Sequence, residues 1–290
     1  ELRLQLRIND ETILAGRGIT GSPDALLRTA ARKVLSRTAP YIVAAETYGT
    51  NPLAAYDEAT AIIDKRPRTD EEVAYAYNLR GLILAARKKY EYAEAQYVEA
   101  FLLDPGLPTP HYNLGNLLRD EGSFDEALIQ YGEALRLDPR DAETHVALAE
   151  LFIDRREYDH AFGEFREALR LDPLDKYAHN ALGDFLSNDA VPGDPSHPRR
   201  REAEAKEQYL TAIRLDPVYP DPHAGLGNLL NAEHNVAGAE SEFKTCVRLD
   251  PARAAAQHTL AWFLRQEDKV DEAIVHYKAA ILADRDDAYA

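Results

Sequence analysis

Apolar side chains recur along most of the chain at the spacing of amphipathic helices, and the segments that carry them come in pairs. In residues 111–118 the apolar positions fall three or four residues apart, and residues 125–135 repeat this after a short turn. Such spacing places the apolar side chains on one face of each helix. A Leu-Asp-Pro string follows the second segment and predicts the end of its helix, because proline cannot continue one. The pattern therefore predicts repeated pairs of antiparallel helices.

The Leu-Asp-Pro string sets a period for the whole array. Its prolines are 34, 34, 44 and 34 residues apart, at Pro105, Pro139, Pro173, Pro217 and Pro251. When this proline is numbered position 32 of a block, position 8 holds Gly or Ala, position 24 Tyr or Phe, and positions 20 and 27 small residues. Small residues let two helix axes approach closely, and an aromatic ring fills the space between them. The blocks are 74–107, 108–141, 142–175, 176–219, 220–253 and 254–287.

This pattern resembles the tetratricopeptide repeat (TPR) family in its 34-residue period, its Leu-Gly pair, its Ala-aromatic-Ala spacing and its terminal proline. The resemblance covers residues 74–290. It implies an all-α fold, a right-handed superhelical solenoid of helix-turn-helix hairpins. One departure is Arg80, which occupies position 7 of the first block and weakens the inner face of that helix.

Position 4, an aromatic in the family, is a histidine in four blocks, namely His111, His145, His179 and His223. These histidines belong to different repeats, so their helices should lie ~8–10 Å or more apart. A zinc ion needs its donors at about 2 Å from a common point. We therefore expect no metal and interpret the histidines as packing substitutes for the aromatic residue.

The first 73 residues are not a clean repeat. Residues 2–8 and 12–15 read as two strands and residues 22–36 as a helix, which predicts a β-hairpin and helix remnant over residues 1–38. Helices around residues 41–48 and 52–64 predict a degenerate capping hairpin over residues 39–73. This order is similar to bacterial TPR proteins that carry a small α/β domain, often behind a membrane anchor. We expect a cytoplasmic protein, or the soluble part of a longer anchored one, with any anchor outside this chain.

The last block has no polar capping helix after it. Val270, Ile274 and Ile281 are then expected on an exposed apolar face, because each repeat buries its face only against its neighbours. Homo-oligomerisation through this end is one way to cover it. The fourth block also carries an insert over residues 187–201 that ends in Arg199–Arg201, which either begins a helix or contacts an acidic partner.

Charge and motifs exclude several function classes. The chain has 34 basic and 50 acidic residues, a net charge of −16, which argues against nucleic acid as a partner. A single cysteine excludes a Cys-rich zinc site. Residues 16–21 match G-x-G-x-x-G, but the helix is expected to start only after the third glycine, so the dinucleotide reading is rejected. We expect no catalytic residue and no cofactor.

The family resemblance places positions 2, 5, 6, 9, 12 and 13 of each block on a concave groove. There the sequence offers amides, phenols and carboxylates, which suit a peptide main chain and basic side chains. The candidate groove residues are Tyr112, Asn113, Asn116, Glu150, Asp154, Tyr177, Asn180, Asp184, Asn228 and Trp262. We therefore expect a non-catalytic scaffold that binds a protein or peptide, with basic residues in that partner as one possibility.

Two further inferences come from the resemblance. TPR co-chaperones that grip acidic chaperone tails use a Lys/Asn/Asn/Lys/Arg clamp, and its last two positions here are Glu143 and Ala147, so such a tail is not expected as partner. The alternative function is a substrate-selecting or regulatory arm of an enzyme, such as a protein O-glycosyltransferase, whose catalytic domain lies outside this chain.

Overall fold

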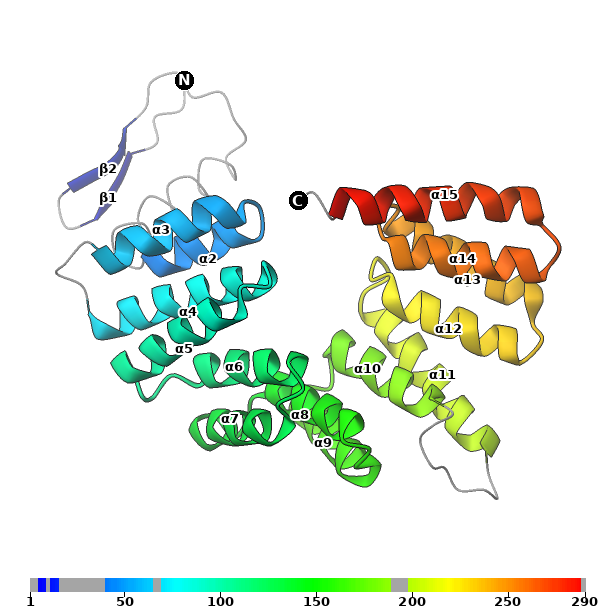
Figure 1. Ribbon diagram of the computed structural model, residues 1–290, viewed down its shortest axis with the longest axis horizontal. Helices are drawn as coiled ribbons and strands as arrows, with labels where there is room; N and C mark the ends of the chain where they lie inside the picture. Colours follow the sequence, from blue (N-terminus) through cyan, green and yellow to red (C-terminus); the bar gives the residue numbers. More distant parts are fainter. Residues whose placement is uncertain (1–4, 9–10, 16–39, 65–68, 189–197, 288–290) are drawn as a thin grey trace. The chain divides into compact units, whose positions relative to one another are not determined.

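The computed structural model of the chain describes residues 5–8, 11–15, 40–64, 69–188 and 198–287 (Figure 1). Strands β1 (Gln5–Ile8) and β2 (Glu11–Ala15) form an antiparallel pair with a register shift between Leu6 and Arg7. The predicted helix at residues 22–36 and the glycine motif at residues 16–21 lie outside the described residues. Most of the insert, residues 189–197, also lies outside them.

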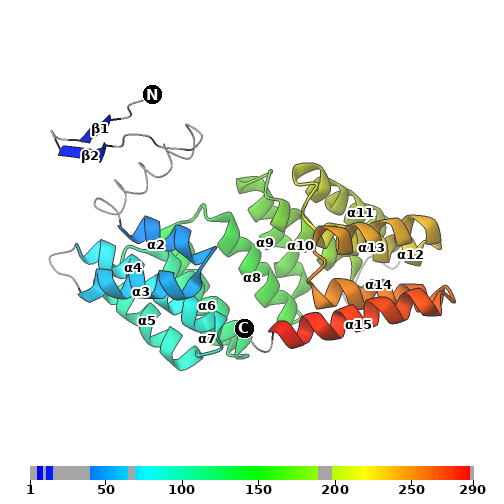
Figure 2. The same cartoon turned by 90° about the horizontal axis from the view of Figure 1, so that it is seen from above.

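Helices make up the rest of the described chain, and consecutive helices contact each other as pairs. Figure 2 shows one such pair, α14 and α15, running antiparallel side by side. The predicted all-α solenoid of helix-turn-helix hairpins is confirmed. The helices are α2 (Pro40–Tyr48), α3 (Pro52–Asp64), α4 (Asp70–Ala86), α5 (Tyr90–Leu103), α6 (Pro108–Asp120), α7 (Phe124–Leu137), α8 (Ala142–Asp154), α9 (Tyr158–Leu171), α10 (Lys176–Ser187), α11 (Pro198–Leu215), α12 (Asp221–Ala232), α13 (Val236–Leu249), α14 (Ala254–Gln266) and α15 (Val270–Asp287).

The chain divides into two compact units, Glu1–Pro139 and Arg140–Ala290. In the second unit one continuous apolar core runs through the helix pairs and includes Phe165, Tyr209 and Phe243, all nearly inaccessible to water. In the first unit the described core has two parts, one around α2, α3 and α4 and one around Tyr97. Within each unit, neighbouring helix pairs therefore bury their apolar faces against one another, as a repeat array requires.

The glycine of the Leu-Gly pair, at position 8, lies against the aromatic ring of position 24, which fills the space that a side chain at position 8 would need. A Cβ added at Gly115 would lie 2.6 Å from the ring of Tyr131, and one at Gly183 would lie 2.7 Å from the ring of Tyr209. Real Cβ atoms do not approach that closely, so the rings of Tyr131 and Tyr209, as they are placed, require glycine at position 8 of their blocks. Two blocks have alanine there, Ala149 and Ala261. This contact holds the two helices of a pair together and explains why the two positions recur together.

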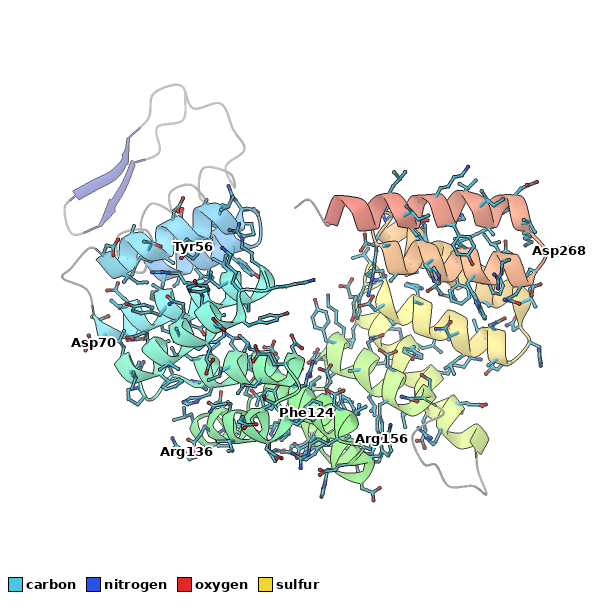
Figure 3. The ribbon with its side chains drawn as sticks, viewed as in Figure 1. Tyr56, Asp70, Phe124, Arg136, Arg156 and Asp268 are labelled. Carbon is cyan, nitrogen blue, oxygen red and sulfur yellow. The ribbon has the colours of Figure 1, made fainter. Side chains whose placement is uncertain are left out.

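In five of the described helix pairs, the turn between the two helices has a left-handed residue at position 15. These residues are Lys88, Gly122, Arg156, His234 and Asp268, with φ between 58° and 81°. The amide N–H of the following residue bonds back five residues, as Glu157 does to the carbonyl oxygen of Phe152 at 2.7 Å, which is a Schellman motif. Figure 3 labels Arg156 and Asp268 at two of these turns. Only Gly122 has the residue type that this conformation favours.

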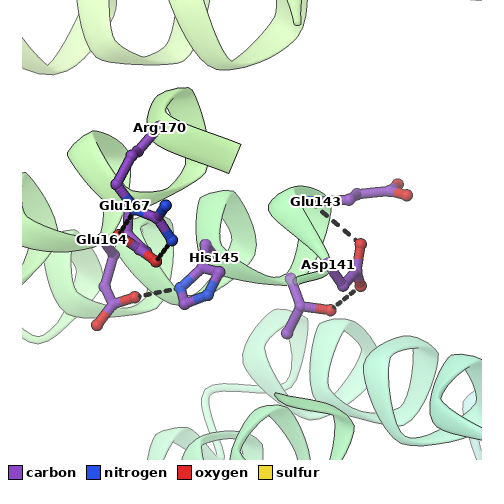
Figure 4. A network of polar contacts seen from close by, with 7 residues as sticks. Asp141, Glu143, His145, Glu164, Glu167 and Arg170 are labelled. Atoms are coloured by element: carbon purple, nitrogen blue, oxygen red, sulfur yellow. Dashed lines mark hydrogen bonds and ion pairs between the residues drawn. The ribbon is translucent and has the colours of Figure 1, made fainter. Parts of the chain in front are cut away.

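Aspartates define the junctions between pairs. Asp172, from a Leu-Asp-Pro string, accepts a hydrogen bond from the N–H of Leu174 at 2.9 Å, which fixes the turn that proline begins. Asp141 caps α8 by accepting from the N–H of Glu143, as Figure 4 shows. The aspartates at the repeat boundaries therefore hold these turns and helix starts through hydrogen bonds from the backbone to their side chains.

Arg80, the departure at position 7, is accommodated by a neighbouring ring. Its guanidinium carbon lies 5.0 Å from the centroid of the Tyr56 ring, and its Nη2 donates to the Tyr56 hydroxyl at 3.2 Å. Tyr56 lies on α3 and is labelled in Figure 3. The cation is held by the helix pair that precedes the array, so its cost to the apolar face is partly offset.

Candidate functional site

The position-4 histidines are hydrogen-bonded across each helix pair. In every case Nδ1 contacts the side-chain oxygen of the Gln or Glu at position 23, on the second helix of the same pair. The pairs are His111–Gln130 at 2.8 Å, and His145–Glu164, His179–Gln208 and His223–Glu242 at 2.6 Å. Figure 4 shows His145 and Glu164. Packing alone was therefore an incomplete interpretation, because the histidine also bonds the two helices to each other.

No metal geometry arises from these histidines. Among the residues that the structure describes, no three His, Cys, Asp or Glu side chains gather closely enough to hold an ion. In the first block position 4 is Tyr77, and there the side-chain oxygen of Gln96 at position 23 is buried without a hydrogen-bond partner. In the other blocks the histidine thus provides a hydrogen-bond partner for the side-chain oxygen at position 23, which in the first block has none.

The candidate groove residues all lie on the first helices of their pairs, α6 in the first unit and α8, α10, α12 and α14 in the second. We call the surface that the candidates of the second unit line the helix-A surface. The candidate residues differ in how far water reaches them. Asp154, Tyr177, Asp184, Asn228 and Trp262 are exposed. The half-buried members are Tyr112, Asn116 and Glu150, and the buried ones are Asn113 and Asn180.

Position 9 is coupled to the aromatic residue at position 24. The Tyr131 hydroxyl donates to Asn116 Oδ1 at 2.6 Å, and the Tyr209 hydroxyl donates to Asp184 Oδ1 at 2.7 Å. In the pair whose position 24 is Phe243 this donor is missing, and its position-9 residue, Asn228, is exposed with no hydrogen bond within the described chain. Among the four candidate asparagines, Asn228 is therefore the one whose side chain is exposed.

The two buried amides bond within the protein. Asn113 Nδ2 donates to Asn78 Oδ1 at 2.9 Å and so links two successive first helices. Asn180 Nδ2 donates to Asp184 Oδ2 at 3.0 Å, on the next turn of α10. Their burial restricts their direct contact with a partner, and Asn113 acts as a structural link.

The second unit also contains an aromatic cluster that the sequence did not indicate. The rings of Tyr177 and Tyr219 lie 5.1 Å apart, edge to face. Lys176 Nζ lies 4.9 Å and 5.5 Å from the two ring centroids and forms an ion pair with Asp216. Tyr219 is in the turn before α12, outside the helical positions considered, so no periodicity could have found it.

Asp184 has an altered proton affinity. Desolvation by the surrounding protein raises the pKa of its carboxyl, and the nearby Glu150 raises this pKa further, while the bonds from Tyr209 and Asn180 oppose the shift. Because the residue is still open to water, the solvent limits this effect. The carboxylate is thus held by neutral donors and lies near a second carboxylate, an arrangement that favours a cation.

The remaining sequence predictions concern the insert and the last helix. Arg201 Nη2 donates to the carbonyl oxygen of Phe185 at 3.2 Å, which ties the start of α11 to α10. On α15, Val270, Ile274 and Ile281 are exposed. Self-association through them stays a prediction.

Comparison with known proteins reinforces this repeat architecture. A family model described as a TPR repeat matches residues 115–154. No curated protein sequence matches the chain. Among the described residues, no helix has both the length and the apolar character needed to cross a membrane.

Several solved structures share the fold. PilF of Pseudomonas aeruginosa is 21% identical, with a TM-score of 0.58 over 72% of this chain and 90% of that one. The APC/C hetero-tetramer Cut9–Hcn1 is 16% identical, with a TM-score of 0.64 over 90% and 53%. The human IFIT1 dimer with PPP-AAAA is 17% identical, with a TM-score of 0.66 over 81% and 56%.

Proposed function

We propose that this chain, which is built of tandem tetratricopeptide repeats, is a non-catalytic scaffold that binds a partner protein or peptide on its helix-A surface. The observation that carries the proposal is the exposure of large rings there. Tyr177 is 58% exposed and Trp262 is 41% exposed, on helices whose leucine and phenylalanine side chains are buried. Exposed Tyr and Trp supply much contact area at low entropic cost and are enriched where binding energy concentrates.

Polar groups beside the rings support a peptide as the partner. Asn228 presents a side-chain amide that can donate to a peptide carbonyl and accept from its N–H. Asp184 adds an exposed carboxylate in the same unit. Among the proteins of similar fold, Cut9–Hcn1 is a complex of proteins and IFIT1 is recorded with PPP-AAAA. The net charge of −16 of this chain favours a protein partner over an anionic ligand such as PPP-AAAA.

Selection from a random peptide display library on the full chain tests this function. Peptides that bind the wild type should bind the double variant Tyr177→Ala/Asn228→Ala about tenfold more weakly, since a ring and an amide contact are lost. The control is Tyr92→Ala, because Tyr92 is a tyrosine at least as exposed as Tyr177 but lies on the second helix of its pair. Equal loss in both variants, or no selected peptide, contradicts the proposal.

A further inference from the structure

A carboxylate, an amide and two phenol rings gather on one side of α10. Tyr177, Asn180 and Asp184 are three and four residues apart, so they follow the same face of the helix. Tyr219 comes from the turn before α12 and packs edge to face against Tyr177. We call these four residues the Asp184 cluster.

One polar atom of the cluster has no partner. Asn180 is 7% exposed, its Nδ2 donates to Asp184, and its Oδ1 is buried without a hydrogen bond within the described chain. A buried carbonyl oxygen that lost its water without gaining a donor costs roughly 1–3 kcal/mol. A ligand that brings an N–H group to this oxygen would recover that cost.

The first unit shows which donor is missing. Asn78, at position 5 like Asn180, accepts from Asn113 at position 6 of the next block. The residue equivalent to Asn113 after Asn180 is Gly225, which has no side chain to donate. A Cβ at Gly225 would lie 2.4 Å from the ring of Tyr209, so this position cannot carry asparagine. The ring that orders Asp184 therefore also removes the internal donor for Asn180.

Two positive groups beside the cluster are each paired with a carboxylate outside it. Lys176, whose Nζ lies 4.9 Å from the Tyr177 ring centroid, forms an ion pair with Asp216, and Arg253 forms one with Asp221. Asp184 itself is bonded to the neutral groups of Tyr209 and Asn180. An exposed carboxylate with neutral donors, near Glu150, leaves a site whose charge a cation would complement.

We propose that the Asp184 cluster binds the guanidinium group of an arginine in the partner, an inference that rests on the binding function proposed above. A guanidinium group has five N–H donors in one plane, enough for the Asp184 carboxylate and for Asn180 Oδ1 together. Its flat face stacks on an aromatic ring, which Tyr177 offers with most of its surface open. A lysine ammonium lacks this flat shape and is the weaker fit.

Binding requires a small movement. Asn180 Oδ1 is closed off from water in the ligand-free chain, whereas Asp184 is exposed. The guanidinium group therefore meets Asp184 first, and the Asn180 side chain turns to meet the next N–H donor. This order makes the Asn180 side-chain amide a direct reporter of occupancy.

The first test uses peptide display selection on the full chain. Wild type, Asp184→Asn and the matched control Asp159→Asn are each panned with the same random library. Asp159 is exposed on α9, a second helix, so its variant removes one charge outside the cluster. We expect arginine at one peptide position to be enriched about tenfold with wild type and Asp159→Asn, and this enrichment to disappear with Asp184→Asn.

The outcomes separate the two proposals. Peptides selected without arginine enrichment, or with enrichment that survives Asp184→Asn, overturn the arginine site and leave the scaffold function standing. If no peptide is selected with any of the three chains, both the arginine site and the scaffold function are contradicted.

The second test uses Nα-acetyl-arginine amide as the probe, with side-chain amide resonances of the ¹⁵N-labelled full chain as readout. Asn180→Asp identifies the Asn180 signal by its loss. A saturable shift of this signal with the arginine probe, at least severalfold larger than with the neutral citrulline analogue, supports the site. Equal shifts with both probes, or none, overturn it.

Discussion

His276 Nδ1 lies 2.8 Å from Gln257 Oε1, and this pair exchanges the residue types of His111 and Gln130, which are also 2.8 Å apart. The histidine is on the second helix in the last pair and on the first helix in the other four. The bond is therefore a property of positions 4 and 23 together. It belongs to the architecture of the array.

The two glutamines at position 23 of the first two blocks should respond oppositely to the same substitution. Gln96 has a buried, unpartnered oxygen, so Gln96→Leu should raise the free energy of unfolding by about 1 kcal/mol. Gln130 is bonded to His111, so Gln130→Leu should lower it by a similar ~1 kcal/mol. Denaturant unfolding of both full-length variants checks this. Shifts of the same sign would contradict the account.

The left-handed turns predict a stabilising substitution. Arg156 has φ of 61°, a conformation that costs a non-glycine residue about 1 kcal/mol or more. Arg156→Gly should therefore raise the free energy of unfolding by up to about 1 kcal/mol. Gly122→Ala is the converse variant and should lower the stability. Urea unfolding midpoints measure both, and a less stable Arg156→Gly chain would refute the assignment of strain to this turn.

Position 9 separates structural from binding amides. Asn116→Ala removes the acceptor of the hydrogen bond from the buried Tyr131 hydroxyl and should cost about 1 kcal/mol of stability. Asn228→Ala removes an exposed side chain without hydrogen bonds in the described chain and should change stability by less than about 0.5 kcal/mol. Peptide affinity should fall in Asn228→Ala. Equal destabilisation by the two variants would show that the hydroxyl bond does not distinguish them.

The raised pKa of Asp184 predicts a pH trend with a definite sign. The folded chain binds the Asp184 proton more tightly than the unfolded chain, in which an aspartate has a pKa of about 3.9. The stabilising contribution of Asp184 is complete below that pH and is lost as the pH rises through the folded pKa. Asp184→Asn has no such loss, so its stability relative to wild type should increase with pH through this window.

The size of this trend should stay below about 1 kcal/mol, because Asp184 is open to water. Urea unfolding at a series of pH values measures it, and Asp159→Asn is the control. The test concerns only how the stability of Asp184→Asn relative to wild type changes with pH, because the changed hydrogen bonds of the variant shift this stability by the same amount at every pH. A relative stability that decreases with pH would contradict the assignment.

The repeat fold could be predicted because its main contact leaves marks in the sequence. A ring at position 24 requires glycine or alanine at position 8, and the pairs Gly115–Tyr131 and Gly183–Tyr209 show why. The histidine bonds were missed because each column was considered alone. Reading position 4 together with position 23, and noticing the exchange in Gln257 and His276, would have found them.

The candidate surface was harder to predict because exposure depends on the side chains around each position. Asn116 and Asn228 both occupy position 9, but Asn116 is half-buried and bonded to Tyr131, whereas Asn228 is exposed. Which of them faces water depends on the side chains that surround each position, and periodicity does not encode that. Tyr219 lies in a turn after Pro217, where a helical pattern gives no expectation.

Site-specific photo-crosslinking tests the central claim, that the helix-A surface binds the partner, most directly. A photoreactive phenylalanine analogue is placed at Asn228 on α12 or at Ser241 on α13, both exposed positions of the same helix pair, and each chain is irradiated with a display-selected peptide. We expect the crosslinked peptide to form from position 228 and to stay at background from position 241. Equal crosslinking from both positions, or a stronger signal from position 241, would contradict the account.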